Sequence, residues 1–339
     1  EAKHRAQHLR FHTKVDFLEN ELKQIVEFKT SMAIGDPFPN NFTKNVQKEL
    51  KLLGILNAVL SGDDLNAFRM LSLNIRDIQL WFGRHAGIFP HLLNVSAEIQ
   101  YNKAIPALIQ PIVDDNGNVR DNASPELLQI RNELGQTRQR LRSVFESVVR
   151  KLAKKGYLAD ITESFLNSRR VVAVGAEHKR IVKGILHGES DSAKTAYIEP
   201  EETIELNNIV GELERAEQRE VYRILSLTTA ALRHYKSELQ DYYTLSGIYD
   251  FIKAKAQLAI ALNADLPILS PHPIVKLIDA YHPILFLHNK VQQKTTIPLN
   301  ITLDKKQRIL IISGPNAGGK TVSMKTVGIL QLMLQSGLL

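Results

Sequence analysis

The chain has 339 residues, of which 44% are hydrophobic and 23% charged, and these proportions are those of an ordinary globular protein. This length leads us to expect roughly two or three domains, and no apolar run approaches the roughly 20 residues of a membrane span, so we expect no membrane partner. The lack of cysteine excludes disulfide bonds and thiolate chemistry, and it agrees with the cytoplasmic location that we predict. The net charge of +7 leaves a polyanionic partner open.

The first third of the sequence is predicted to be mainly helical. Residues 1–30 and about 43–110 show apolar residues at helical spacing with few helix breakers. The segment from Ile112 to Val119 contains an Asn-Gly pair, which predicts a small hairpin.

Two long helices are predicted next. Ser124-Pro125-Glu126 is typical of a helix start, with a serine cap, a proline at the first helical position and an acid in the first turn. Apolar residues then recur in steps of three and four until Gly156, and a second such run extends from Leu206 to Tyr235. At about 1.5 Å per residue, helices of about 30 and about 38 residues would be about 45 and 57 Å long. Because each apolar seam needs a partner, we expect an antiparallel, coiled-coil-like pair.

Residues 157–200, between the two helices, predict a small β module. Short runs such as Val171–Val174 and Thr195–Ile198 have β character and are bounded by Gly, His and Ser. From Arg138 to Lys194 there are 13 Lys/Arg and 6 Asp/Glu, an excess of +7 that equals the net charge of the whole chain. Such a concentration is typical of proteins that bind a phosphate backbone, although a solvated helix face is the plain alternative. The residues predicted to contact nucleic acid are Arg169, Arg170, Lys179, Arg180, Lys183 and Lys194.

The most specific motif, G-x-x-x-x-G-K-T, lies near the C-terminus. The apolar run Arg308–Ser313 predicts a buried strand before it, and helical spacing follows it, which is the context of a phosphate-binding loop. Glycines let backbone N–H groups approach the phosphates of ATP, Lys320 would contact the β- and γ-phosphates, and the Thr321 hydroxyl would ligate Mg²⁺. The predicted nucleotide-binding residues are Gly314, Pro315, Asn316, Ala317, Gly318, Gly319, Lys320 and Thr321.

The rest of an ATPase site is not found in the sequence. A phosphate-loop ATPase also needs a carboxylate on a later strand to hold Mg²⁺, and a residue that positions water. Only 18 residues follow Thr321, and none of them is Asp or Glu. We therefore expect a fragment of an ATPase that has no complete catalytic set and negligible hydrolysis of its own.

Together these motifs resemble the MutS family of DNA mismatch-repair ATPases, and most closely its second, shorter bacterial type. In the C-terminal part the resemblance rests on His282-Pro283, Pro298–Ile301, the loop Gly314–Thr321 and Lys325–Gly328. The stretches that are similar to the second type are Ala176–Lys179, Gly184–His187, Ser190–Ser192, Ile198–Pro200 and Glu205–Asn208. Tyr281 and Ala193-Lys194 depart from the residues that are usual in the family.

The resemblance implies a mainly α fold with α/β parts. We expect a helical core (1–123), an outgoing lever helix (124–156), a β clamp at the tip (157–200), a returning lever helix with further core (201–265) and the first part of a P-loop ATPase domain (266–339). The resemblance also implies that the full-length protein is a homodimeric ATPase whose clamp closes on duplex or branched DNA in repair or recombination control. The alternative is an ATP-switched factor that binds rRNA or ribosomes. A structural ATPase of the long-coiled-coil kind is disfavoured, since there the phosphate loop precedes the coiled coil.

Overall fold

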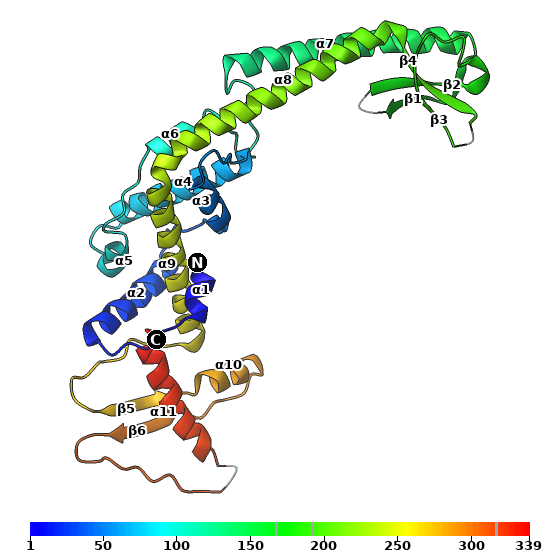
Figure 1. Cartoon of the computed structure of the whole chain (residues 1–339). Helices are drawn as coiled ribbons and strands as arrows, with labels where there is room; N and C mark the ends of the chain where they lie inside the picture. Colours follow the sequence, from blue (N-terminus) through cyan, green and yellow to red (C-terminus); the bar gives the residue numbers. More distant parts are fainter. Residues whose placement is uncertain (167–168, 192, 316–317) are drawn as a thin grey trace. The chain divides into compact units, whose positions relative to one another are not determined.

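The computed structural model describes residues 1–166, 169–191, 193–315 and 318–339. The fold is mainly helical with a small antiparallel sheet, which confirms the predicted fold class (Figure 1). The chain divides into two compact units, one made of residues 1–50, 67–106 and 235–339, the other of residues 51–66 and 107–234. No helix in the described part of the chain is long and apolar enough to cross a membrane.

The first unit has an aromatic core. Phe38 packs edge-on against Trp81 with ring centroids 5.1 Å apart, and Trp81 stacks on Phe89 at 4.9 Å. Trp81 is fully buried, and its indole N–H donates to the Asp36 carbonyl over 2.8 Å. The helices before residue 110 are α1 (Ala2–Gln7), α2 (Val15–Ala33), α3 (Gln47–Leu53), α4 (Gly62–Arg84), α5 (Pro90–Val95) and α6 (Ala104–Ile109). Of these, α1, α2 and α5 lie wholly in the first unit, as does α9 (Lys236–Leu262), whereas α3, α4 and α6 have residues in both units.

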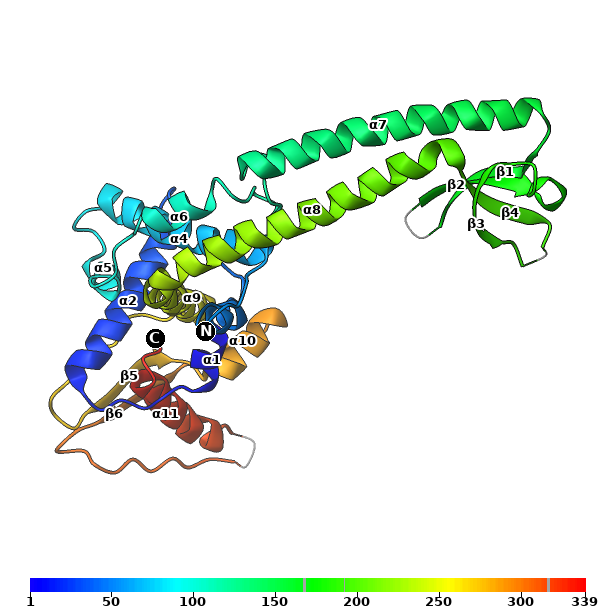
Figure 2. The same ribbon diagram turned by 45° about the horizontal axis from the view of Figure 1, so that its top comes forward.

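The predicted pair of long helices is confirmed in the second unit. Helix α7 spans Pro125–Lys154 and α8 spans Glu201–Leu232, followed by the short 3-10 helix η2 (Arg233–Tyr235). In the contacts between them, residue numbers fall along α8 as they rise along α7, which shows that the helices are antiparallel (Figures 1 and 2). The contacts that show this are Ser124–Glu220 at 2.6 Å, Arg131–Glu217 at 2.8 Å and Arg138–Glu214 at 2.6 Å.

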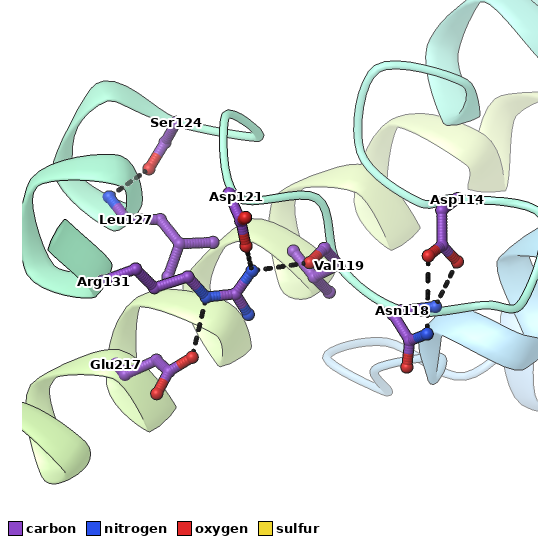
Figure 3. Close-up of polar contacts among 8 residues, drawn as sticks. All are labelled: Asp114, Asn118, Val119, Asp121, Ser124, Leu127, Arg131 and Glu217. Carbon is purple, nitrogen blue, oxygen red and sulfur yellow. Dashed lines mark hydrogen bonds and ion pairs between the residues drawn. The ribbon is translucent and has the colours of Figure 1, made fainter. Parts of the chain in front are cut away.

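Polar contacts fix the start of α7, as Figure 3 shows. The Ser124 hydroxyl accepts the Leu127 amide N–H over 3.0 Å, as the predicted cap requires. Arg131 donates to Glu217, to Asp121 and to the carbonyl of Val119, and thereby ties the helix to the preceding hairpin. That hairpin is closed by the bridge Val113–Val119 and by Asp114, whose carboxylate accepts the backbone N–H of Asn118 over 2.8 Å.

The β module is a four-stranded antiparallel sheet with the order β1-β2-β4-β3. Its strands are β1 (Leu158–Leu166), β2 (Arg169–Gly175), β3 (Gly184–Glu189) and β4 (Thr195–Pro200), with the 3-10 helix η1 (Ala176–His178) after β2. One face packs on the last turns of α7, where Phe145 and Val148 meet Val172 and Ile198 in a buried cluster. The sheet is also joined directly to α8 through the chain, because β4 ends at Pro200 and α8 begins at Glu201.

The C-terminal part differs from the prediction at one strand. Two antiparallel strands form, β5 (Val275–Ala280) and β6 (Leu299–Leu303), together with α10 (Pro283–Val291) and α11 (Lys320–Gln335). The strand predicted for Arg308–Ser313 is absent, and Ile309 and Ile311 are 85% and 86% exposed. A strand needs hydrogen-bonding neighbours; in the described residues β5 and β6 pair with each other, and no strand pairs with residues 308–313.

Candidate functional site

The phosphate loop has the backbone that its glycines allow. Gly314 has φ 149° and Gly319 has φ 81°, both in the region that favours glycine. The Gly318 amide N–H donates to the Pro315 carbonyl over 2.9 Å. Asn316 and Ala317, also predicted to bind nucleotide, lie outside the described residues.

The groups that could hold phosphate converge at the start of α11. The Lys320 ammonium donates to the Gly314 carbonyl over 2.5 Å, which places it over the loop and leaves two of its three N–H donors for phosphate oxygens. The first turn of α11 has no side-chain cap, so its amide N–H groups and the positive end of the helix dipole face an incoming anion. Thr321 is exposed at the second helical position, where its hydroxyl could ligate Mg²⁺ held by the phosphates.

The loop therefore fits a nucleotide phosphate, although it lacks the strand that was expected to lead into it. An extended segment leads into Gly314 instead. A cavity of about 590 Å³ lies elsewhere in this unit, between the end of α9, β5, α10 and α11. Residues such as Leu277, Phe286 and Leu334 line this cavity, and no residue of the phosphate loop does. Because its lining is mainly apolar, this cavity is a gap between packed elements and not a site suited to an anion.

Three of the six predicted basic residues are held in ion pairs inside the β module. These pairs are Arg169–Glu199 at 2.6 Å, Arg170–Glu163 at 2.7 Å and Lys179–Glu189 at 2.6 Å. Arg170 also lies over the ring of Phe145, 4.4 Å from its centroid. The charge of these three residues is thus largely compensated within the module.

The other three basic residues are exposed. Arg180 and Lys183 lie between η1 and β3, and Lys194 lies just before β4. In the part of the chain that the structure describes, no ion pair involves any of them. They are therefore the cations of the module that remain available to a polyanion.

A buried carboxylate that sequence reasoning did not single out lies beside them. The Glu199 side chain is fully buried and accepts hydrogen bonds from Arg169, His187 and Asn207 over 2.6, 2.7 and 2.8 Å. Burial by itself raises the pKa of Glu199, but the hydrogen bonds from His187, Asn207 and Arg169 outweigh it and keep the pKa below the ordinary value. The available signal was the resemblance to the second family type, since His187, Glu199 and Asn207 each lie in one of the stretches that carry it.

No group of three or more His, Cys, Asp or Glu that could hold a metal ion occurs within the described ranges. The magnesium ligand predicted at Thr321 would act through a bound nucleotide and not through such a group.

Known proteins match most of the chain. It is 38% identical over 294 residues to Endonuclease MutS2 of Listeria welshimeri, which covers 86% of this chain and 36% of the relative. The protein of the same name from Geobacillus is 35% identical over 250 residues, with 74% of this chain and 31% of the relative covered. That from Leuconostoc citreum is 30% identical over 329 residues, with 96% and 40% covered. The chain thus spans only between 31% and 40% of the length of these relatives. No family profile matches the chain.

Proposed function

We propose that this chain, which belongs to the MutS family in its second, shorter bacterial type, carries the nucleotide-phosphate site and part of the nucleic-acid surface of a DNA-handling ATPase. The relatives that support the family assignment are all named MutS2. The observation that carries the functional proposal is the phosphate loop, in which Lys320 lies over Gly314 at the uncapped start of α11.

The nucleotide would bind with its β- and γ-phosphates in this loop. Lys320 and the first-turn amides of α11 would neutralise phosphate charge, and Thr321 would orient Mg²⁺. A bound ion of this kind polarises the γ-phosphate for hydrolysis, for which the whole protein would supply the remaining groups. We expect ATPase activity of the full-length homodimer.

The nucleic-acid surface would be the β module. Arg180, Lys183 and Lys194 are exposed cations, and phosphate backbones are bound largely through such charges. In the full-length protein, ATP would change how the long helices and the module close on duplex or branched DNA, in repair or recombination control. A coupling of this kind between two sites has a free energy of about 1–3 kcal/mol.

Calorimetric titration of the full-length protein with Mg·ATP tests the nucleotide site. Replacement of Lys320 by Ala should abolish the heat of binding, because the loop loses its only fixed positive charge between Gly314 and Thr321. Lys325→Ala is the matched control, since Lys325 is an exposed lysine of the same helix one turn further on. Equal binding by Lys320→Ala and the wild type would refute the site.

A competition experiment tests the nucleic-acid partner. Labelled branched DNA, duplex DNA and ribosomes compete for the full-length protein at one fixed salt concentration, because affinities depend steeply on salt. The proposal expects DNA to win. Preference for ribosomes by orders of magnitude would replace it with the ATP-switched ribosome-binding function, since exposed cations by themselves do not distinguish DNA from RNA.

A further inference from the structure

The carboxylate of Glu199 joins three elements at the point where β4 runs into α8. Its Oε1 accepts from Arg169 of β2 and from Asn207 in the second turn of α8, and its Oε2 accepts from His187 of β3. Arg169 uses a second arm, since its Nη2 donates to Asn208 Oδ1 over 2.7 Å. The guanidinium therefore bridges the sheet and α8.

The two faces of the sheet are held by different forces. Ile198 and Glu199 are neighbours in β4, so their side chains point to opposite faces. Ile198 belongs to the apolar cluster with Phe145 and Val148 of α7, whereas Glu199 binds α8 through Asn207. Apolar packing is non-directional, whereas hydrogen bonds to a buried carboxylate require a defined geometry.

From this difference we infer that Glu199 is a positioning residue that locks the β module to α8, and that Arg169 serves this joint instead of contacting a phosphate. The module is then oriented by α8, while its contact with α7 tolerates small shifts. The consequence for binding rests on the proposed function: a locked module holds Arg180, Lys183 and Lys194 in one arrangement toward a polyanion.

The joint is sensitive because its charge is fully buried. An ionised carboxylate inside a protein is tolerated only when donors surround it, and Glu199 has three. Glu199→Gln keeps the shape but removes the negative charge and replaces one of the two acceptor oxygens by an N–H₂ donor. If this donor replaces Oε1, it faces Arg169 and Asn207, and the hydrogen bond from α8 is lost. If it replaces Oε2, the bonds from Arg169 and Asn207 remain but lose the ionic charge that strengthens them.

Hydrogen–deuterium exchange of the full-length protein tests the joint without any ligand. In Glu199→Gln we expect exchange at least 10-fold faster in β3 and in residues 201–208 of α8, and unchanged exchange in residues 127–134 of α7. Glu163→Gln is the matched control, because it also removes one negative charge from an Arg ion pair of the module, but Glu163 is at the surface. Its exchange should equal that of the wild type. Wild-type exchange in Glu199→Gln would overturn the inference.

A second variant covers the case in which Glu199→Gln does not fold. Asn207→Ala removes only the donor from α8 and leaves Arg169 and His187 on the carboxylate. We expect faster exchange in residues 201–208 in this variant as well. Unchanged exchange there would equally overturn the joint.

Salt-dependent binding of duplex DNA separates positioning from phosphate contact. If Arg169 contacts a phosphate, Arg169→Ala lowers the slope of log affinity against log salt by about 0.9, as Lys194→Ala should. The joint predicts an unchanged slope for Arg169→Ala together with a roughly 10-fold weaker affinity, and a lowered slope overturns it. If wild-type protein binds no nucleic acid while Glu199→Gln still exchanges faster, the proposed function fails and the joint stands.

Discussion

At the scale of single residues, the partners that the fold brings to a charged side chain decide what that side chain does. Arg169 and Lys194 belong to the same basic stretch of sequence, yet Arg169 is engaged by Glu199 and Asn208, whereas Lys194 is exposed. The sequence identifies both as cations and predicts the same role for both. Only the position of Glu199, next to Pro200 at the end of β4, separates them.

The ionisation of Glu199 makes the β module sensitive to acid. Its folded pKa lies below the ordinary value of 4.5, so its contribution to stability is complete above that value and is lost as the pH falls through the lowered folded pKa. Urea midpoints of the wild type and Glu199→Gln should therefore differ at pH 7 and converge as the pH falls through the lowered folded pKa. A difference that does not begin to shrink once the pH is below 4.5 would contradict an ionised carboxylate at this position.

The cap of α7 gives a second prediction for a single residue. Ser124 accepts from the Leu127 amide and donates to Glu220 over 2.6 Å, so Ser124→Ala removes both contacts. We expect a loss of about 1 kcal/mol, within a range of 0.5–2, in the free energy of unfolding measured with urea. Ser143→Ala serves as the control, because Ser143 is exposed in the middle of α7 and alanine favours a helix there. Equal effects of the two changes would exclude the capping role.

At the scale of elements, the last turns of α7 and the β sheet pack against one another. Phe145 is fully buried against Val172 and Ile198, and the Arg170 guanidinium lies over its ring. The helical period of the sequence places Phe145 beside the α7 seam, but it does not show that this side chain packs on a sheet instead of on α8. That assignment follows from the return of the chain after Gly156.

Replacement of Phe145 by Ala tests this packing. The change should lower the free energy of unfolding by about 3–5 kcal/mol, because it leaves a cavity between helix and sheet. Phe165→Ala is the matched control, since Phe165 is 70% exposed on β1 and should cost little. Denaturant titration followed by circular dichroism measures both. A cost below about 1 kcal/mol for Phe145→Ala would show that the sheet does not depend on α7.

At the scale of the whole molecule, the net charge of +7 equals the excess of the segment from Arg138 to Lys194. Ion pairs inside the β module and across α7 and α8 compensate part of that segment. Lys320 lies in the other unit, where its ammonium contacts the Gly314 carbonyl of the phosphate loop, and it is not part of this compensated segment. Charge thus marks the two sites that we propose, one for a nucleic acid and one for a nucleotide.

The salt dependence of nucleic-acid binding tests the surface that we propose on the β module. The combined change of Arg180, Lys183 and Lys194 to Ala should lower the slope of log affinity against log salt by about 2.7, or about 0.9 for each lost phosphate contact. The control replaces three exposed lysines of the other unit, Lys48, Lys103 and Lys236. Equal slopes in the two triple variants would remove the β module from the nucleic-acid surface.

Local rules determined much of this protein directly from its sequence. The start of α7 at Ser124-Pro125, the long antiparallel helices and the glycine positions of the phosphate loop depend on caps, periodicity and φ angles, which are properties of neighbouring residues. Tertiary structure decided the remainder. It left Arg308–Ser313 without a strand partner, paired half of the predicted cations, and assembled Arg169, His187 and Asn207 around Glu199. The physical reason is that strand pairing and charge compensation join residues distant in sequence, and no local pattern specifies which partners meet.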